Sequence, residues 1–346
     1  MSEQAGKLFS TVADATPYEV VSALLVEHYG LGGALSRLNS ERDENFHLQG
    51  LDGKQYVVKL THPAEPREVT DFQTRALLHA QAQDPGLPIP HVLPRKDDAP
   101  WAAVRMPEGG ERVLRVLSYL DGKPLHQVAR TPAQRRDLGR TLARLDRALS
   151  GFRHPAAHHY LLWDIQHCER LRGLAEGQEP QLRCWLDHFE DEVKPRLAGL
   201  RRQVIHNDLN PYNVLVNAED ETGTAGLIDF GDMVHAPLVD ELAVACSYQL
   251  SASVNPLDTA ADLIAAYHEL NALQEAEVDL LYDLILTRLY MTVTITDWRA
   301  ARHPENRVYI LRNNGISRDG FARLSALGRE EATTYLRRIC GMKGQA

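Results

Sequence analysis

Two short patterns in the sequence combine carboxylates with an amide at the spacing that phosphoryl transfer uses. The first is His-x-Asp-x-x-x-x-Asn, which runs from His206 through Asp208 to Asn213 and is followed by an apolar stretch. The second starts at Ile228 and reads Ile-Asp-Phe-Gly-Asp, which places Asp229 sixteen residues after Asn213. Phosphoryl transfer leaves little covalent chemistry to the protein, so positioning and charge neutralisation dominate.

Each polar side chain of these patterns fits one task in such a reaction. Asp208 would accept the proton of the attacking hydroxyl as the catalytic base. Asp229 and Asn213 would hold Mg²⁺, since this ion prefers hard oxygen ligands. His206 would brace the loop by hydrogen bonding. A turn or a strand-end cap explains any one of these residues, but the two patterns in this order favour a kinase.

Lys59 ends the short apolar run Tyr56–Lys59 and is expected to bind the α- and β-phosphates of a nucleotide. Such a lysine needs a polar partner on the following helix. Gln73 occupies the expected position and would offer a neutral hydrogen bond, whereas Glu68 lies five residues earlier and off the same helix face. Both alternatives stay open.

The other nucleotide contacts are assigned by position. The segment Ser40–Asn45 is expected to form the turn over the phosphates, with Ser40 as a contact, although a plain polar turn fits it equally well. Neither G-x-G-x-x-G nor G-x-x-x-x-G-K-[ST] occurs, which disfavours a P-loop enzyme. The base is expected beside the backbone of Ser118, Tyr119 and Leu120.

The elements that must position these residues change in character along the chain. A helix is predicted over about 17–30, where Thr16-Pro17 supplies a cap and Gly30 a stop. A β-hairpin follows, with strands 45–49 and 56–60 joined through Asp52-Gly53. A helix after Pro66 and two strands complete this part, and those strands are 101–106 and 112–120.

From about Pro124 helical spacing dominates, interrupted by short strands at 204–206, 213–216 and 226–229. Strands first and helices later predict an α+β fold with two unequal lobes. We therefore expect a nucleotide-binding lobe over 1–120, mainly antiparallel β, and a larger helical catalytic and substrate lobe over 121–346.

Length and composition agree with this division and exclude several classes. The chain has 346 residues, more than one core usually carries. A net charge of −9 disfavours a nucleic-acid partner. The four cysteines form no C-x-x-C pair, and no apolar run approaches the roughly 20 residues that span a bilayer. A cytoplasmic protein without a membrane partner is expected, as a monomer or a homodimer.

The residues above resemble the aminoglycoside phosphotransferase and choline kinase family, which has a protein-kinase-like fold. Lys59, the run Leu87–Pro90 and the run Tyr119–Leu125 agree with that family in order and spacing, as do the segments 204–213 and 227–232. The closest resemblance is to the hydroxylysine kinase branch. Four segments are typical of that branch: Ser40–Phe46, Trp163-Asp164, Gly231–Val239 followed by Glu241–Ala243, and His303–Asn306.

The resemblance implies an enzyme that phosphorylates an alcohol group on a small amine or amino acid, with Mg²⁺ and with ATP or GTP as donor. The acceptor would bind in the helical lobe, where an amino acid needs a cation for its carboxylate and an anion or aromatic ring for its ammonium. The candidates are Trp163, Asp164, Arg288, Asp297, Trp298 and Arg299.

Other readings remain open at this point. The acceptor could instead be homoserine, choline or an aminoglycoside. A non-catalytic nucleotide-binding protein of the same fold is disfavoured, because Asp208, Asn213 and Asp229 are all present. A protein-substrate kinase is disfavoured because no Ala-Pro-Glu segment follows Asp229 and a helix is expected within about ten residues.

Overall fold

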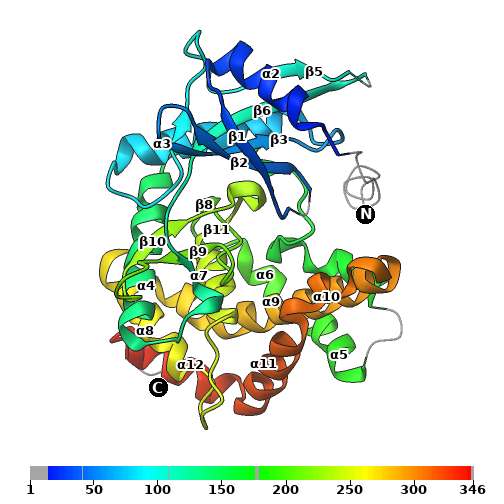
Figure 1. Cartoon of the computed structure of the whole chain (residues 1–346). Helices are drawn as coiled ribbons and strands as arrows, with labels where there is room; N and C mark the ends of the chain where they lie inside the picture. The colour runs from blue at the N-terminus through cyan, green and yellow to red at the C-terminus, as the bar shows by residue number, and fades with distance from the viewer. Residues whose placement is uncertain (1–14, 41, 108, 176–178, 344–346) are drawn as a thin grey trace. The chain divides into compact units, whose positions relative to one another are not determined.

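The computed structural model describes residues 15–40, 42–107, 109–175 and 179–343. The chain forms two compact units (Figure 1). The first comprises Met1–Asp121 and Phe152–Tyr160, and the second comprises Gly122–Gly151 and Leu161–Ala346. The sequence had placed 152–160 in the C-terminal lobe. This segment lies in the first unit because Phe152 and His154 pack against Phe72, with ring centroids 6.1 and 5.7 Å away.

The first unit is built on an antiparallel sheet in the order β1-β2-β3-β6-β4, with β5 also paired to β6. The strands are β1 (Gly33–Leu38), β2 (Glu44–Gly50), β3 (Gln55–Leu60), β4 (Val92–Leu93), β5 (Ala102–Arg105) and β6 (Glu111–Ser118). The predicted hairpin is β2–β3, and Gly53 in its turn has φ of 78°, a conformation that favours glycine.

Two helices belong to this unit. The first is α2 (Tyr18–Tyr29), which ends at Gly30 in the left-handed conformation, as expected from the sequence. Its apolar face packs on alternate residues of the strands, among them Phe46, Val58 and Leu114. The second is α3 (Arg67–Gln83), which begins directly after Pro66. It packs against β4 and β6.

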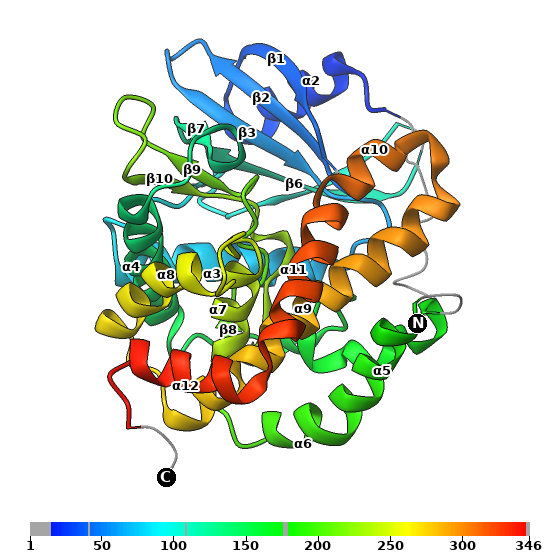
Figure 2. The ribbon, with the colours of Figure 1, turned by 90° about the horizontal axis from the view of Figure 1, so that it is seen from below.

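The second unit is mainly helical. Its α-helices of eight residues or more are α4 (Pro132–Leu149), α5 (Pro180–His188), α7 (Leu238–Ser247), α8 (Asp258–Leu270), α9 (Glu275–Arg302), α11 (Asn314–Leu327) and α12 (Arg329–Ile339). The helix η3 (Ile165–Leu174) follows Asp164, and the short α10 (Arg307–Ile310) and η7 (Leu311–Asn313) follow α9. Figure 2 shows α11 and α12 along α9, against which α7 also packs.

Two small sheets lie within the second unit. One has the order β10-β9-β7, and the other pairs β11 with β8. Their strands are β7 (Lys123–Pro124), β8 (Arg202–Ile205), β9 (Val214–Val216), β10 (Thr224–Leu227) and β11 (Val234–Pro237). The catalytic pattern therefore lies between β8 and β9, and Asp229 follows β10. No helix among the described residues is long and apolar enough to cross a bilayer.

Candidate active site

One buried carboxylate binds the backbone of the loop that follows β8. Glu241, in the first turn of α7, accepts hydrogen bonds from the backbone N–H groups of His206 and Asn207, the latter at 3.1 Å. Asn207 has φ of 65°, a left-handed conformation that asparagine tolerates better than most residues. Burial raises the pKa of Glu241, against the influence of His206 and these two N–H donors. The first turn of α7 therefore fixes the position of the backbone that leads into Asp208.

His206 connects this loop to the segment after β10 that carries Asp229. Its Nδ1 accepts a hydrogen bond from the Asp208 N–H at 3.2 Å, so its Nε2 carries the proton and donates to the Ile228 carbonyl at 3.0 Å. The edge of the ring packs on Phe230, with centroids 4.6 Å apart. The buried imidazole therefore holds the two sequence patterns together, which is the bracing contact that the sequence suggested.

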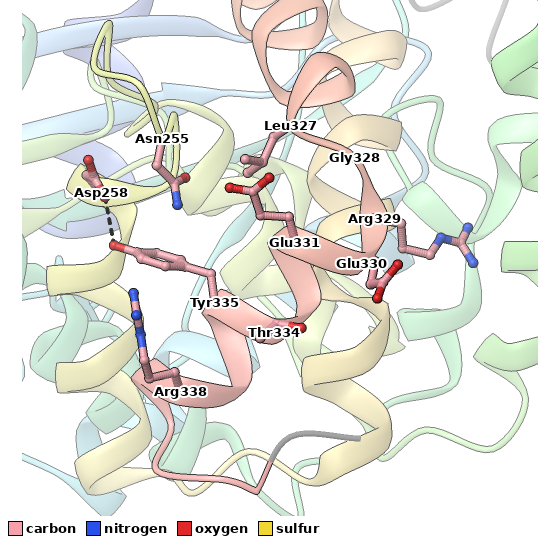
Figure 3. A pocket seen from close by; sticks show the side chains of 10 residues that line it. All are labelled: Asn255, Asp258, Leu327, Gly328, Arg329, Glu330, Glu331, Thr334, Tyr335 and Arg338. Atoms are coloured by element: carbon pink, nitrogen blue, oxygen red, sulfur yellow. Dashed lines mark hydrogen bonds between the residues drawn. The ribbon is translucent and has the colours of Figure 1, made fainter. Parts of the chain in front are cut away.

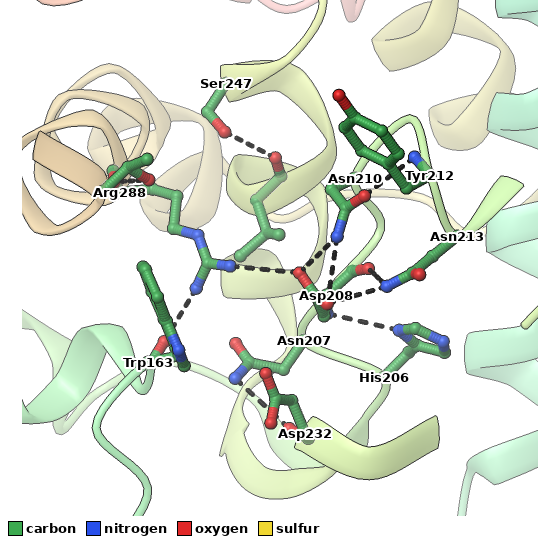
Figure 4. A network of polar contacts seen from close by, with 12 residues as sticks. Trp163, His206, Asn207, Asp208, Asn210, Tyr212, Asn213, Asp232, Ser247 and Arg288 are labelled. Carbon is green, nitrogen blue, oxygen red and sulfur yellow. Dashed lines mark hydrogen bonds and ion pairs between the residues drawn. The ribbon is translucent and has the colours of Figure 1, made fainter. Parts of the chain in front are cut away.

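The carboxylate of Asp208 is fixed from three sides (Figure 4). Asn210 Nδ2 lies 3.0 Å from both oxygens, Asn213 Nδ2 donates to Oδ2 at 2.7 Å, and Arg288 lies 3.4 Å from Oδ1. The side chain remains 20% exposed, which leaves the carboxylate accessible to a ligand. Burial and the neighbouring Asp232 carboxylate raise the pKa of Asp208, although Arg288 and Asn210 oppose them.

Asn213 and Asp229 carry the kind of oxygen donors that a hard cation prefers. Asn213 Nδ2 also donates to the Asp208 carbonyl at 2.9 Å, so its amide nitrogen is engaged and its oxygen faces elsewhere. Asp229 is exposed and adopts φ of 62° directly after β10. Within the described ranges no group of three or more His, Cys, Asp or Glu side chains forms a closed metal cage. The donor set fits Mg²⁺, which binds few protein oxygens and keeps several waters.

Two of the acceptor candidates lie beside Asp208. Arg288, on α9, donates to the Trp163 carbonyl at 2.8 Å and lies 5.1 Å above the Trp163 ring. Arg288 is almost fully buried, so these contacts and Asp208 define its position.

The remaining candidates are engaged elsewhere. Asp164 is buried and caps η3 by accepting from Gln166. Asp297 accepts from Asn314 and Arg318, both at 2.8–2.9 Å. Trp298 lies beneath Arg302. Arg299 is eleven residues beyond Arg288, about 16 Å along α9 at about 1.5 Å per residue.

In the first unit, Lys59 is buried on β3 next to β6. Gln73 Oε1 accepts a hydrogen bond from Arg115 at 2.8 Å, and Glu68 is exposed. Of the two candidate helix partners of Lys59, Gln73 is therefore the buried one, and it also binds a second cationic side chain, that of Arg115.

The other predicted nucleotide contacts lie at the ends of strands. The Ser118 hydroxyl accepts from the His91 N–H at 2.9 Å, and the exposed Tyr119 ring lies 4.6 Å from that of His47. Leu120 is partly buried and Ser40 is exposed. Glu41, within the expected phosphate turn, lies outside the described residues.

The sequence assigned no role to several residues that shape this site. Asn210 and Asp232 stood inside the two patterns, so their positions were visible. The hydrogen bonds from Asn210 to Asp208 and the influence of Asp232 on the Asp208 pKa were not visible. Glu241 lies in an apolar helical run and gave no spacing signal. The role of Glu241 follows from the burial of its carboxylate beside the His206 and Asn207 N–H groups, which only the structure shows.

An aromatic stack flanks the catalytic loop. Tyr212 lies between Asp208 and Asn213 in sequence, and its ring stacks on His126 with centroids 4.0 Å apart. Arg312 lies 4.9 Å from the Tyr212 ring and 3.8 Å from the Tyr309 ring. Four side chains from three separate segments thus form one stack, which we call the Tyr212 stack.

A hollow of about 760 Å³ lies elsewhere in the second unit, between α12 and the turn before α8 (Figure 3). Its lining carries both charge signs, including Asp258, Glu331 and Arg338, and the Tyr335 hydroxyl donates to Asp258 at 2.9 Å. None of the residues around Asp208 lines it. This hollow is therefore separate from the candidate active site around Asp208.

Comparison with known proteins identifies the family of this chain. A model of the phosphotransferase enzyme family matches residues 34–278. Hydroxylysine kinase of Mus musculus is 26% identical over 318 residues, covering 84% of each chain. Hydroxylysine kinase of Danio rerio is 26% identical over 322 residues, covering 88% of this chain and 90% of the relative.

Solved structures share the fold. A microcompartment-associated aminopropanol kinase superposes with a TM-score of 0.66 at 18% identity, covering 94% of this chain and all of the other. An amicoumacin kinase solved with AMP-PNP and Ca²⁺ gives 0.64 at 15% identity, covering 92% and 96%. The predicted α+β fold of protein-kinase type is thus confirmed, and so is the enzyme class. Because the family model matches well over half of the chain, the protein belongs to the phosphotransferase enzyme family.

Proposed function

We propose that this protein is a Mg²⁺-dependent kinase that transfers the γ-phosphate of ATP or GTP to a hydroxyl group of a small amino acid or amine, of the hydroxylysine kinase type. The observation that carries the proposal is the Asp208 carboxylate, which Asn210, Asn213 and Arg288 hold in a partly open position. The hydroxylysine kinases among the relatives support the choice of acceptor class.

In this proposal the chain's residues bind, orient and accept a proton. Asp208 accepts the proton of the acceptor hydroxyl as its oxygen attacks the γ-phosphorus and the nucleoside diphosphate leaves. The Asn213 amide oxygen and the Asp229 carboxylate hold the cation, which when bound neutralises phosphate charge. Lys59 contributes to binding the phosphates of the nucleotide. His206 keeps Asp208 and Asp229 in a fixed relation through its two hydrogen bonds.

For the acceptor, Trp163 and Arg288 are the candidates that lie beside Asp208. Arg288 would attract a carboxylate and the Trp163 ring would lie against an ammonium group. An amino acid is therefore favoured over a polycationic aminoglycoside, which a buried arginine would repel.

The first experiment measures nucleotide consumption with ATP and with GTP on 5-hydroxylysine, homoserine, choline, ethanolamine and kanamycin. Turnover with at least one acceptor is expected. Asp208→Asn should then lower kcat by about 10²- to 10⁴-fold, the usual contribution of a general base, with nucleotide affinity unchanged. Asp220→Asn is the matched control, since Asp220 is an exposed aspartate in the same unit.

A second experiment tests the acceptor class with a matched pair. Homoserine and 3-aminopropanol differ only in the carboxylate. Wild type should prefer homoserine, and Arg288→Met should remove that preference. Binding of nucleotide without turnover on any acceptor would instead favour the non-catalytic alternative, and normal turnover by Asp208→Asn would refute the assignment of the base.

A further inference from the structure

The catalytic loop orients its carboxylate through one asparagine. Asn210 Nδ2 lies 3.0 Å from both oxygens of Asp208, and Asn210 Oδ1 accepts a hydrogen bond from the Tyr212 N–H at 2.8 Å. Figure 4 shows Asn210 between Asp208 and Tyr212. Because the Asn210 amide is bonded at both ends, a shift of the backbone at Tyr212 would turn this amide and move the carboxylate with it.

The segment after β7 holds Tyr212 from outside the loop. The His126 N–H donates to the Pro211 carbonyl at 3.1 Å, and the His126 ring stacks on the Tyr212 ring with centroids 4.0 Å apart and planes 27° from parallel. Burial lowers the pKa of His126, and the charges of Arg130 and Arg312 add to this against the backbone bond to Pro211. The ring that stacks on Tyr212 at pH 7 is therefore a neutral imidazole.

The segment after α9 brings an arginine to the same ring. Arg312, on η7, lies 4.9 Å from the centroid of the Tyr212 ring and 3.8 Å from that of the Tyr309 ring. Its Nη1 donates to the Tyr309 carbonyl at 3.1 Å, which fixes the guanidinium against its own segment. A guanidinium over an aromatic face is attracted by the negative charge density of the ring. Two segments outside the loop therefore hold Tyr212.

Helix α9 supports this arginine as well as the arginine that contacts the base. Asn314, two residues after Arg312, donates to Asp297 Oδ1 and to Thr296 Oγ1 on α9, both at 2.9 Å. Arg288 of the same helix lies 3.4 Å from the carboxylate of the base. The helix therefore contacts the base directly and also anchors the segment that holds the loop.

The Tyr212 stack lies outside the apolar core. Tyr212, Tyr309 and Arg312 are half-buried, and His126 is exposed. Contacts of this kind at partly exposed positions contribute little to the stability of a whole fold. A catalytic group, by contrast, loses rate steeply when it is displaced by about 1 Å. We therefore expect the stack to matter for the position of the base more than for stability.

We propose that the Tyr212 stack positions the catalytic base, with Arg312 as a positioning residue that acts on Asp208 through Tyr212 and Asn210. The proposal rests on the kinase function above. It gives a role in catalysis to Tyr309 and Arg312, to which the sequence assigned none.

The test measures kcat and KM of Arg312→Met on the acceptor that the wild type uses best. Methionine nearly keeps the length of the side chain and removes the planar cation. The value of kcat should fall by about 10- to 100-fold, with nucleotide affinity and acceptor KM within about two-fold of the wild type. Arg312→Lys keeps a cation beside the rings and should recover part of the loss. The matched control is Arg338→Met, since Arg338 lies 5.0 Å from the Tyr335 ring in the separate hollow, and its kcat should equal that of the wild type.

A double-mutant cycle tests the route from Arg312 to the base. In the Asn210→Ala background, Arg312→Met should lower kcat by less than about three-fold, because the link to Asp208 is already broken. Additive losses would overturn the proposal, and so would a kcat within about two-fold of the wild type. A loss that appears in acceptor KM would also overturn it, since an arginine that binds the acceptor directly has that effect.

A second measurement does not depend on turnover. The Tyr212 and His126 N–H groups are both hydrogen-bonded to the loop, and they should exchange with solvent faster in Arg312→Met than in the wild type or in Arg338→Met. Equal exchange rates in all three proteins would overturn the proposal. If the wild type turns over no acceptor, the kinase function fails, and faster exchange in Arg312→Met still supports the hold of the stack on the loop.

Discussion

Replacement of Glu44 by glutamine tests how strongly one ion-pair network stabilises the first unit. The Glu44 carboxylate accepts hydrogen bonds at 2.6 Å from the Thr16 hydroxyl, Arg37 and Arg112, and another at 2.9 Å from the Thr16 N–H. Arg112 is almost fully buried and Glu44 is only 13% exposed. The network joins the segment before α2 to β1, β2 and β6, next to the turn expected over the phosphates.

The magnitude follows from the pKa of Glu44. Burial raises it, but the hydrogen bonds from Thr16, Arg37 and Arg112 prevail and lower it from 4.5 to about 2. Each pKa unit corresponds to about 1.4 kcal/mol, so the charged form stabilises the fold by about 3 kcal/mol. The unfolded chain binds the proton near pH 4.5 and the folded chain near pH 2, so this stabilisation is complete at neutral pH and disappears as the pH falls through that range.

Urea unfolding at pH 7 and at pH 3, followed by far-ultraviolet circular dichroism, measures the effect. Glu44→Gln should lower the free energy of the first unfolding transition by about 3 kcal/mol at pH 7 and by about half as much at pH 3. Glu111→Gln is the control, since Glu111 at the start of β6 forms an exposed ion pair with Arg67 at the start of α3 and should change stability by less than about 1 kcal/mol. A loss that is equal at both pH values would refute the reasoning.

Three further predictions concern the second unit. His206→Phe should lower the free energy of unfolding by about 2–5 kcal/mol in urea titrations, because it leaves the Asp208 N–H and the Ile228 carbonyl unbonded. Asp240→Asn should raise the melting temperature more at pH 8 than at pH 5. Burial raises the pKa of Asp240, so the folded state loses stability as the pH rises above the ordinary range of this carboxyl; a gain that shrinks with pH would contradict this. EDTA should abolish turnover until Mg²⁺ is added back, and Asp229→Ala should raise the Mg²⁺ concentration for half-maximal rate at least about 10-fold.

The sequence predicted most elements that carry strong local signals. The ends of α2 followed from Pro17 and Gly30, and the β2–β3 hairpin followed from Asp52-Gly53. Strand β1 was missed because most of its residues are exposed, so it lacks an alternating apolar pattern. Strands β4 and β7 were missed because each has only two residues, too few for any period to show.

The candidate site was predictable to the extent that its residues stand close together in sequence. Asp208, Asn213 and Asp229 occupy two short patterns, and the structure connects those patterns through His206. The contacts made across long distances in sequence were not visible. Arg288 reaches Asp208 from eighty residues away, and Gln73 accepts a hydrogen bond from Arg115 on β6, a contact that no sequence pattern suggested.

The Tyr212 stack constrains how acceptor preference could be redesigned. His126, Tyr212 and Arg312 come from three segments far apart in sequence, yet their flat faces lie on one another. A chimaera that imported the segment from α10 onward from a relative would replace Tyr309 and Arg312 but keep His126 and Tyr212, which would then lose their stacking partners. Such a graft would need all four positions to be exchanged as a set, and the same requirement predicts that these positions vary together among relatives.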